Sequence, residues 1–330
     1  MKPMTDTPVT FDRFTVNRVR ILALLALAMA APFVTYPVLG MTVLCFGLFA
    51  CSFNLLLGYT GLLSFGHAAF LGTAAYVTAH ALKVWELPTL PSLALGAGAA
   101  ALLGAVFGLI ATRRHGIYFA MVTLALAQMM FFVFLKAPFT GGEDGLQGVP
   151  RGSLFGLIDL SDDTTLYYVV LTIVVFGLWV IHRAIHSPFG EILKAIRENE
   201  ARVTSLGYDV ARYKLLAFVL SAGLAGLAGA TKVLVFKFAT LADVHWHVSG
   251  EVVLMTLLGG VGTVIGPMLG AAVVVVLQNE LADKVGSFVT IIIGVIFILC
   301  VLTFRRGIAG ELNDLRRRVL GDARSGSADG

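Results

Sequence analysis

The chain has 330 residues, of which 58% are hydrophobic and only 13% are charged, and its mean hydropathy is +0.88. Soluble domains carry about 25% charged residues, because a large apolar core must be covered by polar surface. The composition argues against an aqueous enzyme, a nucleic-acid-binding protein and a disordered chain, and it predicts a helical membrane protein.

Apolar stretches that could cross a bilayer recur along the chain. A spanning helix needs about 20 predominantly apolar residues. Ten candidate segments, two of them short, lie at 21–38, 40–57, 67–82, 91–112, 117–136, 166–183, 213–236, 251–261, 264–281 and 287–304. We expect an all-α polytopic bundle of about ten membrane segments, or eight if the short pieces are re-entrant hairpins. Residues 21–304 would form the membrane domain, between an N-terminal segment, 1–20, and a basic tail, 305–330.

The first candidate segment also has features of a signal peptide. Arg13, Arg18 and Arg20 precede an apolar run that contains Ala28-Met29-Ala30, which is typical of a secretory signal. The apolar run continues past Ala30, and this favours a helix that is retained in the protein. Cleavage of this helix stays open as an alternative.

Basic residues are distributed unevenly between the two sides of the expected bundle. With the N-terminus in the cytoplasm and alternating spans, 18 of the 24 Lys and Arg residues fall in the inner segments 1–20, 58–66, 113–116, 183–214 and 305–330. The other six are Lys83, Lys136, Arg151, Lys232, Lys237 and Lys284. Cytoplasmic loops carry an excess of Lys and Arg. Both termini are therefore expected in the cytoplasm, and the net charge of +4 needs no nucleic-acid partner.

Two glycine-rich stretches interrupt the apolar pattern. One is Gly58-Tyr59-Thr60-Gly61-Leu62-Leu63-Ser64-Phe65-Gly66-His67, and the other is Gly259-Gly260-Val261-Gly262-Thr263-Val264-Ile265-Gly266-Pro267. Clustered glycines disfavour continuous helix, and non-helical backbone at membrane depth occurs where protein buries it or water lines it. In transporters such breaks lie near the substrate path. Two tight turns between helices are the simpler alternative.

Residues 184–212 form a polar stretch between two expected spans. Ser187 is a candidate N-cap, with Pro188 at the first helical position. Phe189, Ile192, Leu193 and Ile196 follow at helical spacing and form one apolar face, and Gly207 is a candidate helix stop. The pattern predicts an amphipathic helix that either rests on lipid or occupies a groove on another protein. Its mixed charges favour the protein partner.

Several blocks of the sequence resemble a known family. Residues 195–230, AIRENEARVTSLGYDVARYKLLAFVLSAGLAGLAGA, resemble the coupling segment of branched-chain amino-acid ABC-transporter permeases of the LivH/LivM type. GYTGLLSFGHAAFLGTAAY (58–76), GIYFAMVTLALAQM (116–129), TGGEDGLQGVP (140–150) and LLGGVGTVIGPMLGA (257–271) match further blocks in the same order. The TGG-DG-GVP pattern favours the LivM branch of the family.

The resemblance implies an importer of the bacterial inner membrane. In this family a LivH-like and a LivM-like permease form the pore, two cytoplasmic ATPases use ATP, and a periplasmic binding protein delivers the solute. This chain would then bind no cofactor and no metal, and would have no catalytic residues. The coupling role carries over to Ala195, Ile196, Arg197, Glu198, Asn199, Glu200, Leu206 and Gly207, with Phe189 and Ile192 on the same helix.

Few polar residues are available to line a path. The candidates are Asn54, Thr123, Gln128 and Thr256, beside Thr60, Ser64, His67 and Thr263 in the breaks. Ordinary hydrogen bonding between helices is the alternative for each of them, and His67 is expected to bond a backbone carbonyl at its break. Cys45, Cys51 and Cys300 lie in apolar runs without a CxxC pattern, so we expect buried thiols rather than a metal site or a disulfide.

Other functions can be weighed against this one. No Gly-Lys pair occurs, so no GxxxxGK[ST] phosphate-binding loop is present in the sequence. An ion-coupled secondary transporter would place ionisable residues inside its spans, whereas Lys232, Glu251 and Glu280 are expected near outer helix ends. HExxH, the signature of metal-dependent proteases, is absent. Within the family, urea, short-chain amides and other amino acids remain alternative solutes.

An acidic loop is expected on the outer side at 137–165. It carries five acids, Glu143, Asp144, Asp159, Asp162 and Asp163, against one base, Arg151. We expect this loop to help dock the binding protein. A loop that is only solvated is the alternative.

Overall fold

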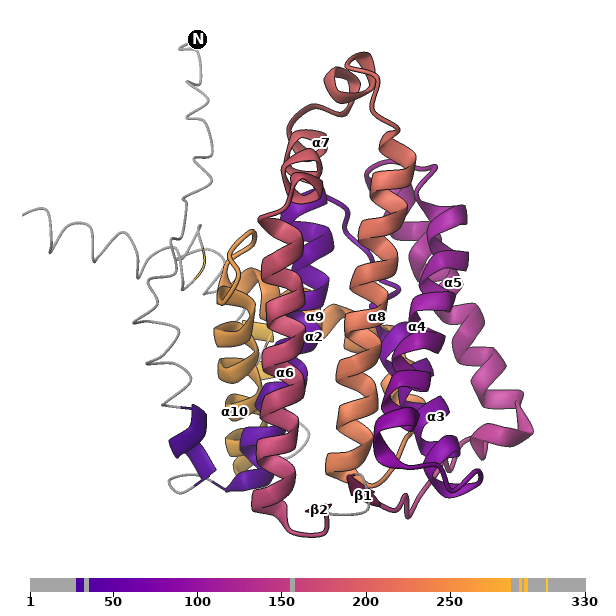
Figure 1. Ribbon diagram of the computed structural model, residues 1–330, viewed down its shortest axis with the longest axis vertical. Helices are drawn as coiled ribbons and strands as arrows, with labels where there is room; N and C mark the ends of the chain where they lie inside the picture. The colour runs from indigo at the N-terminus through magenta and orange to yellow at the C-terminus, as the bar shows by residue number, and fades with distance from the viewer. Residues whose placement is uncertain are drawn as a thin grey trace, which may run out of the picture.

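A computed structural model describes residues 28–32, 36–154 and 158–285, together with residues 291, 292, 294, 295 and 307. Its main helices are α2 (Pro37–Thr60), α3 (His67–Lys83), α4 (Thr89–Ala111), α5 (Ile117–Lys136), α6 (Asp163–Ile185), α7 (Pro188–Ser205), α8 (Val210–Phe236), α9 (Trp246–Gly259) and α10 (Gly266–Val285) (Figure 1). The short elements are two 3-10 helices, η1 (Pro138–Thr140) and η2 (Leu241–Val244), and one antiparallel strand pair, β1 (Ser153–Leu154) and β2 (Ile158–Asp159).

Five helices in the described part of the chain are long and apolar enough to cross a membrane: α2, α4, α5, α6 and α8. The expectation of ten membrane segments is therefore not confirmed. Those expected at 67–82, 251–261 and 264–281 are α3, α9 and α10, of which α3 has 17 residues and α9 only 14. Those at 21–38 and 287–304 lie largely outside the described residues.

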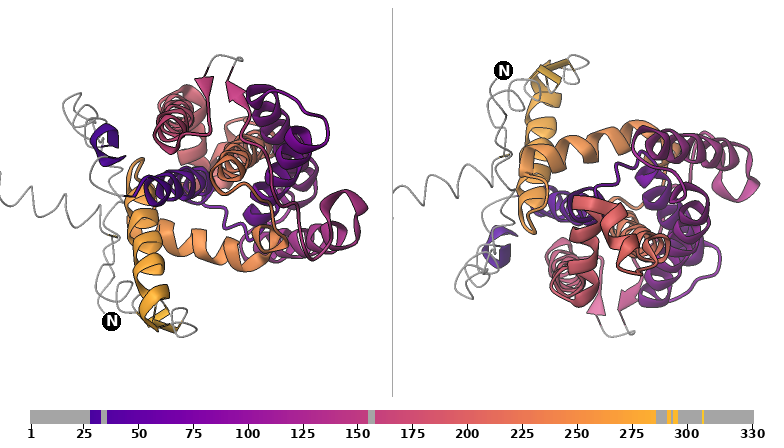
Figure 2. Two further views of the ribbon diagram at one scale, coloured as in Figure 1. Left: turned by 90° about the horizontal axis from the view of Figure 1, so that it is seen from below. Right: turned by 90° about the horizontal axis from the view of Figure 1, so that it is seen from above.

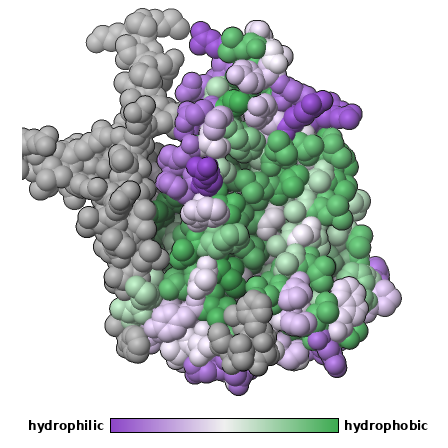
Figure 3. All heavy atoms as spheres, viewed as in Figure 1, coloured by the Kyte–Doolittle hydropathy of each residue, from purple (hydrophilic) through white to green (hydrophobic). Residues whose placement is uncertain are grey.

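The surface of the molecule is divided into bands along the helix direction. On the face shown in Figure 3, apolar residues fill the middle, and hydrophilic residues gather above and below them. Large apolar side chains such as Leu102, Phe132 and Trp179 are exposed within helices that could span. In water such a surface would be an aggregation hazard, whereas in a bilayer it contacts lipid or other membrane proteins.

Helix α8 lies at the centre of the bundle, where it packs on α2, α3 and α4. Small residues allow this close packing, as is common between membrane helices. A Cβ atom at Gly229 would collide with the backbone carbonyl of Leu71 in α3, and one at Gly226 would collide with Ala100 in α4. The high glycine content therefore serves helix packing as well as helix breaking.

Helices α9 and α10 differ in direction from the rest. In both views of Figure 2, α2, α6 and α8 are seen close to end-on, whereas α9 lies across them. Helix α9 follows the 3-10 helix η2, which packs against α3 rather than outside the bundle. A short helix of this kind matches the re-entrant alternative for the segment at 251–261.

The connecting segments gather at two ends, which we call the α7 end and the loop end. The α7 end contains the C-terminus of α2, the α4–α5 turn and residues 186–209, which are linked by contacts from Arg197 and Glu200. The loop end contains 84–88, 137–154, 158–162 and 237–240, which are linked through bonds such as Thr89 to Arg151 and Leu146 to Ala239. This grouping agrees with the alternation expected from the charge pattern.

Candidate functional site

The first helix break lies at the α7 end. Helix α2 continues past Gly58, and the chain leaves the helix at Gly61, whose φ is +74°. The amide of Gly61 donates to the carbonyl of Leu57 at 3.2 Å and closes the last turn. The break therefore spans 61–66, before α3 begins at His67, and the expectation that Gly58 belongs to it is wrong.

Gly58 instead lets the second break approach α2. A Cβ atom at Gly58 would collide with the side-chain oxygen of Asn54 and would lie 2.8 Å from the amide nitrogen of Gly262. Glycine is needed here because two backbones come close together. Gly58 was correctly predicted to be important, but its role is to allow close backbone approach rather than to break the helix.

The second break spans 260–265, between Gly259 at the end of α9 and Gly266 at the start of α10. The break lies inside the stretch 259–267 expected from the sequence but is shorter, because Gly259 still belongs to α9 and Gly266 and Pro267 already belong to α10. Gly260 and Gly262 have φ values of +115° and +82°, which other residues adopt only with strain. Glycines therefore make this turn possible.

Side chains of α2 hold the second break in place. The Asn54 amide donates to the carbonyl of Thr263 at 2.7 Å, and its oxygen accepts from the amide of Gly262 at 2.9 Å. The hydroxyl of Tyr59 donates to the carbonyl of Gly262 at 3.0 Å. Backbone groups that a continuous helix would have paired are thus satisfied by one neighbouring helix.

Helix α7 forms at the expected place, but its predicted N-cap is wrong and it contains an interruption that the sequence did not predict. Pro188 is its first residue, but the hydroxyl of Ser187 donates back to the carbonyl of Ala184 at 2.7 Å and makes no N-cap bond. Asn199 has non-helical backbone angles, and its side chain accepts from the amide of Arg202 at 3.0 Å. An internal N-cap therefore divides the helix into two parts.

The apolar face of α7 packs against this chain's own helices. Leu193 and Ile196 are 1% and 3% exposed, and the helix contacts α2, α6 and α8. Phe189 stacks on Tyr213 of α8, with ring centroids 5.9 Å apart, and Ile192 is half-buried. The amphipathic pattern is confirmed, but its apolar face is already covered, so a partner would meet the opposite, charged side.

Arg197 also turns toward the bundle. Its Nη1 donates to the carbonyl of Gly58 in the last turn of α2. Its Cγ lies 3.2 Å from the position of a Cβ atom at Gly61. Burial lowers the pKa of the guanidinium, which stays charged at neutral pH. Arg197 and the neighbouring Glu198 are both exposed residues, and the Arg197 guanidinium reaches back to the end of α2.

The second part of α7 is attached to α8 and to the α4–α5 turn. The carboxylate of Glu200 accepts from Lys214 at 2.6 Å and lies 3.2 Å from Nδ1 of His115. The Lys214 side chain is only 3% exposed, so this ion pair is partly shielded from water. Leu206 and Gly207 follow α7 as exposed residues, and Gly207 has a φ of +88°, as expected for a stop.

His67 begins α3 inside the bundle and differs from its expected pairing. Its Nε2 lies 2.8 Å from the hydroxyl of Ser221 in α8, not near a backbone carbonyl. Because the Ser221 hydroxyl donates to the carbonyl of Ser52 at 2.6 Å, we assign the imidazole proton to Nε2. Nδ1 is then an acceptor, and it has no hydrogen-bond partner among the described residues.

The four candidate path residues lie in different surroundings. Asn54, Thr123 and Thr256 are buried and bonded within the chain: Thr123 accepts from the amide of Phe65 at 3.1 Å, and Thr256 donates to Val252 at 2.8 Å. Gln128 is half-buried on α5. Contact with a solute stays a prediction for all four.

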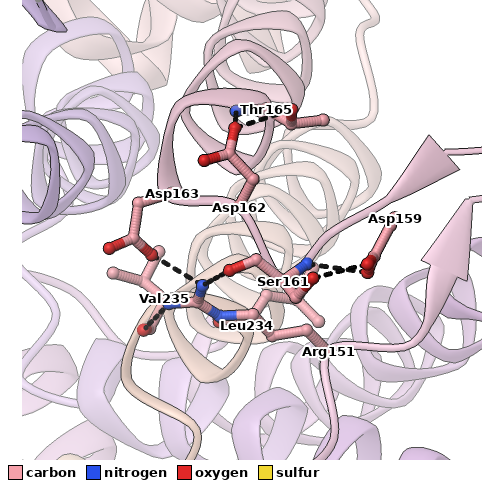
Figure 4. A network of polar contacts seen from close by, with 8 residues as sticks. All are labelled: Arg151, Asp159, Ser161, Asp162, Asp163, Thr165, Leu234 and Val235. Carbon is pink, nitrogen blue, oxygen red and sulfur yellow. Dashed lines mark hydrogen bonds and ion pairs between the residues drawn. The ribbon is translucent and has the colours of Figure 1, made fainter.

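The loop end is organised around Arg151, which the sequence analysis treated only as an outer charge (Figure 4). Its guanidinium donates to the carbonyls of Leu234 and Val235 at 3.1 and 3.2 Å, in the last turn of α8. It also donates to the carbonyl of Ser161 at 3.1 Å and to the carboxylate of Asp163 at 2.6 Å. One side chain therefore joins the loop, α6 and α8.

Three of the five acids in this loop are used within the chain. Asp163 pairs with Arg151, and Asp162 caps α6 by accepting from the amide of Thr165 at 2.9 Å. This backbone bond, with one from the Thr165 hydroxyl, lowers the pKa of Asp162, and bonds from Ser161 lower the pKa of Asp159. The two remaining acids are Glu143 and Asp144, both exposed.

A further ion pair was missed by the sequence analysis. Lys232 of α8 pairs with Asp243 of η2, and both side chains are largely buried. The Lys232 ammonium also lies 5.6 and 5.7 Å from the ring centroids of Phe46 and Phe236. A lysine in an apolar helix indicates that a charged or polar group pairs with it, but only the fold could identify that group as Asp243. No cluster of three or more His, Cys, Asp or Glu side chains suited to a metal occurs in the described part of the chain.

Apolar helices, two non-helical breaks inside the bundle and a polar helix at one end define a membrane-embedded transport protein. The chain belongs to the family of branched-chain amino acid transport system permease components, whose family model matches residues 38–301. It is therefore a transporter permease and not an enzyme, and it is one component of a larger transport system.

Relatives support this assignment. The high-affinity branched-chain amino acid transport system permease protein LivM of Escherichia coli is 29% identical over 315 residues, covering 87% of this chain and 74% of that protein. The probable branched-chain amino acid transport permease protein LivM of Methanocaldococcus jannaschii is 24% identical, covering 53% and 51%. The autoinducer 2 import system permease protein LsrC of Klebsiella pneumoniae is 28% identical, covering 52% and 49%. No solved structure matches the chain significantly.

Proposed function

We propose that the chain is the LivM-like permease subunit of an ABC importer for leucine, isoleucine and valine. A LivH-like permease would complete the translocation path, two cytoplasmic ABC ATPases would bind at the α7 end and hydrolyse ATP, and a periplasmic binding protein would deliver the solute at the loop end. The chain would lie in a bacterial inner membrane with both termini in the cytoplasm.

The observation that supports this proposal best is the presentation of α7. Its apolar face is packed on α2, α6 and α8, so the helix is held beyond the spans with its charged side exposed. A helix that rested on lipid would bury that apolar face in the membrane interface instead. The charged side, which includes Glu198, is suited to a polar groove on another protein.

The solute is tested by uptake in a strain from which this gene has been deleted. We expect uptake of labelled leucine, isoleucine and valine to fall and to return with the wild-type gene. Urea and acetamide uptake should stay unchanged. The name of the LsrC relative concerns another solute, so uptake of autoinducer 2 should be measured in the same strain. Restoration of one of these other solutes alone would contradict the proposed substrate.

The energy source separates this proposal from an ion-coupled secondary transporter. The buried pair of Lys232 and Asp243 is the observation that favours that alternative, because intramembrane charges often serve ion coupling. The ammonium of Lys232 and the carboxylate of Asp243 neutralise each other, and this favours a structural role for the pair. Leucine uptake should stop when cellular ATP is depleted and persist when a protonophore collapses the proton gradient. The reverse result would favour the secondary transporter.

Orientation is tested by cysteine labelling in a background that lacks Cys45, Cys51 and Cys300. A cysteine at Glu143 in the loop end should react with an impermeant maleimide in intact cells. A cysteine at Ser205, at the end of α7, should react only after the membrane is opened. Equal labelling at the two positions in intact cells would contradict the proposed topology.

A further inference from the structure

Three segments that are far apart in the sequence meet at the α7 end. They are the last turns of α2, the second break at 260–265, and α7. The link between α2 and the second break consists of the paired bonds of Asn54 and the bond of Tyr59 to Gly262. The first break follows directly from the end of α2 at Gly61.

Arg197 connects α7 to this assembly. Its guanidinium bonds the carbonyl of Gly58, one of the last carbonyls of α2, where the end of the helix dipole favours a cation. The same nitrogen lies 3.5 Å from the position of a Cβ atom at Gly262, so it also borders the second break. A side chain of the first part of α7 thus bonds the end of α2, from which the first break follows, and borders the second break.

The geometry assigns Arg197 the role of a positioning residue that transmits displacement of α7 to both helix breaks together. The inference rests on the proposed function and changes what Arg197 is expected to do in it. An ATPase would move α7 through its charged side, while Arg197 would pull on the end of α2. Asn54 and Tyr59 would carry that displacement on to residues 260–265.

This arrangement is a series of links, and it has a distinctive consequence. Loss of any one link should disconnect solute movement from ATP hydrolysis, while the ATPases still bind. Loss of two links in the series should do no more harm than loss of one, because the connection is already interrupted. An arginine that contacted the ATPase directly would instead show its effect in ATPase binding.

The test uses the complete importer, with its binding protein and ATPases, reconstituted in proteoliposomes. For Arg197→Gln we expect leucine uptake to fall about tenfold, within the range usual for coupling between two sites, while ATP hydrolysis stays within about twofold. ATPase co-purification should be unchanged. Arg197→Lys should restore part of the uptake per ATP hydrolysed, because an ammonium can still bond one carbonyl. The control is Arg183→Gln. Arg183 lies in the last turn of α6, also at the α7 end, and this variant should behave as wild type.

A second variant keeps the proposal falsifiable if Arg197→Gln does not accumulate in the membrane. Tyr59→Phe removes one hydroxyl bond to Gly262 and should lower uptake per ATP in the same direction.

Three results would overturn the inference: full uptake by Arg197→Gln, full uptake per ATP by Tyr59→Phe, or loss of ATPase co-purification in Arg197→Gln. A wild-type complex that imports no leucine would instead contradict the proposed function. Failure of the inference and failure of the proposed function are therefore distinguishable.

Discussion

The two ends of the bundle use the same chemistry in different settings. At the loop end Arg151 bonds the last carbonyls of α8, and at the α7 end Arg197 bonds a last carbonyl of α2. In both cases a cation satisfies carbonyls that the end of a helix leaves unpaired. Arg151 belongs to a loop that is pinned to α6 and α8, whereas Arg197 belongs to a separate helix.

This difference suggests a division of labour. The Arg151 side chain is 9% exposed and is neutralised by Asp163, so the contacts that hold the loop end together include their own charge balance. Helix α7 is interrupted at Asn199, and beyond its packed apolar face it has polar attachments through Arg197 and Glu200. The loop end is built to hold its shape, and the α7 end is built to pass on a displacement.

The two ends can have separate roles only if the helix bundle between them is rigid. Among the proposed variants, Gly229→Ala should disturb that bundle most. The added methyl would meet the backbone of Leu71, so α8 must move away from α3. We expect the free energy of unfolding to fall by about 3 kcal/mol, as for severe overpacking. Thermal unfolding in detergent measures this effect. The matched control, Gly223→Ala, places its methyl 3.4 Å from Ala101, an ordinary contact, and should be nearly neutral.

Removing the buried anchor of α7 should loosen the α7 end alone. Ile196→Ala should destabilise the docking of α7 by about 2 kcal/mol, the lower range for a buried isoleucine, because a helix at the margin can partly collapse. Amide hydrogen exchange in α7 should accelerate, with no change at the loop end. Leu206→Ala, at a 70% exposed position, is the control and should leave exchange unaltered. Unchanged exchange in Ile196→Ala would show that the apolar face faces a partner after all.

Removing the loop-end arginine should cost stability without uncoupling transport. Arg151→Gln loses the ion pair to Asp163 and most of its carbonyl bonds, so we expect a loss of about 1.5 kcal/mol, as for a hydrogen bond to a charged group. Uptake per ATP should match wild type, in contrast to Arg197→Gln. Lys136→Gln, an exposed charge at the same end, is the control. Uncoupling by Arg151→Gln would contradict the division between the two ends.

The smallest expected effect is the loss of the Asp162 helix cap at low pH. The amide of Thr165 holds the pKa of Asp162 below its usual value, so the cap contributes stability above the unfolded pKa of about 3.9 and loses it as pH falls through the lowered pKa. Exchange of the Thr165 amide should therefore be constant from pH 7 to about pH 5, after correction for intrinsic rates, and should rise below about pH 4. Asp162→Asn keeps the cap without the titration, so its corrected exchange should not rise in acid.

The sequence predicted the parts of this structure that depend on local pattern. The span at 117–136 was placed within its bounds, and α7 was recognised from its apolar spacing and from Pro188. The second break was located by its glycines, since positive φ values at Gly260 and Gly262 are a local property.

The contacts that join distant segments could not be predicted. The spacing of Leu193 and Ile196 shows one apolar face, but it does not say whether α2, α8 or another protein covers that face. Arg197 and Glu198 are adjacent in the sequence and both exposed, and nothing in the sequence shows that the Arg197 guanidinium reaches the carbonyl of Gly58 in α2. Arg151 had no recognisable signal, because its acceptors are mostly backbone carbonyls.

The central claim is that α7 and both helix breaks move together while the loop end stays fixed. Amide hydrogen exchange of the complete importer, measured with and without ATP turnover in the presence of leucine, tests it directly. We predict altered exchange in α7, in 61–66 and in 260–265, and unchanged exchange in 138–163. Altered exchange in α7 without change in either break, or equal change at the loop end, would contradict this account.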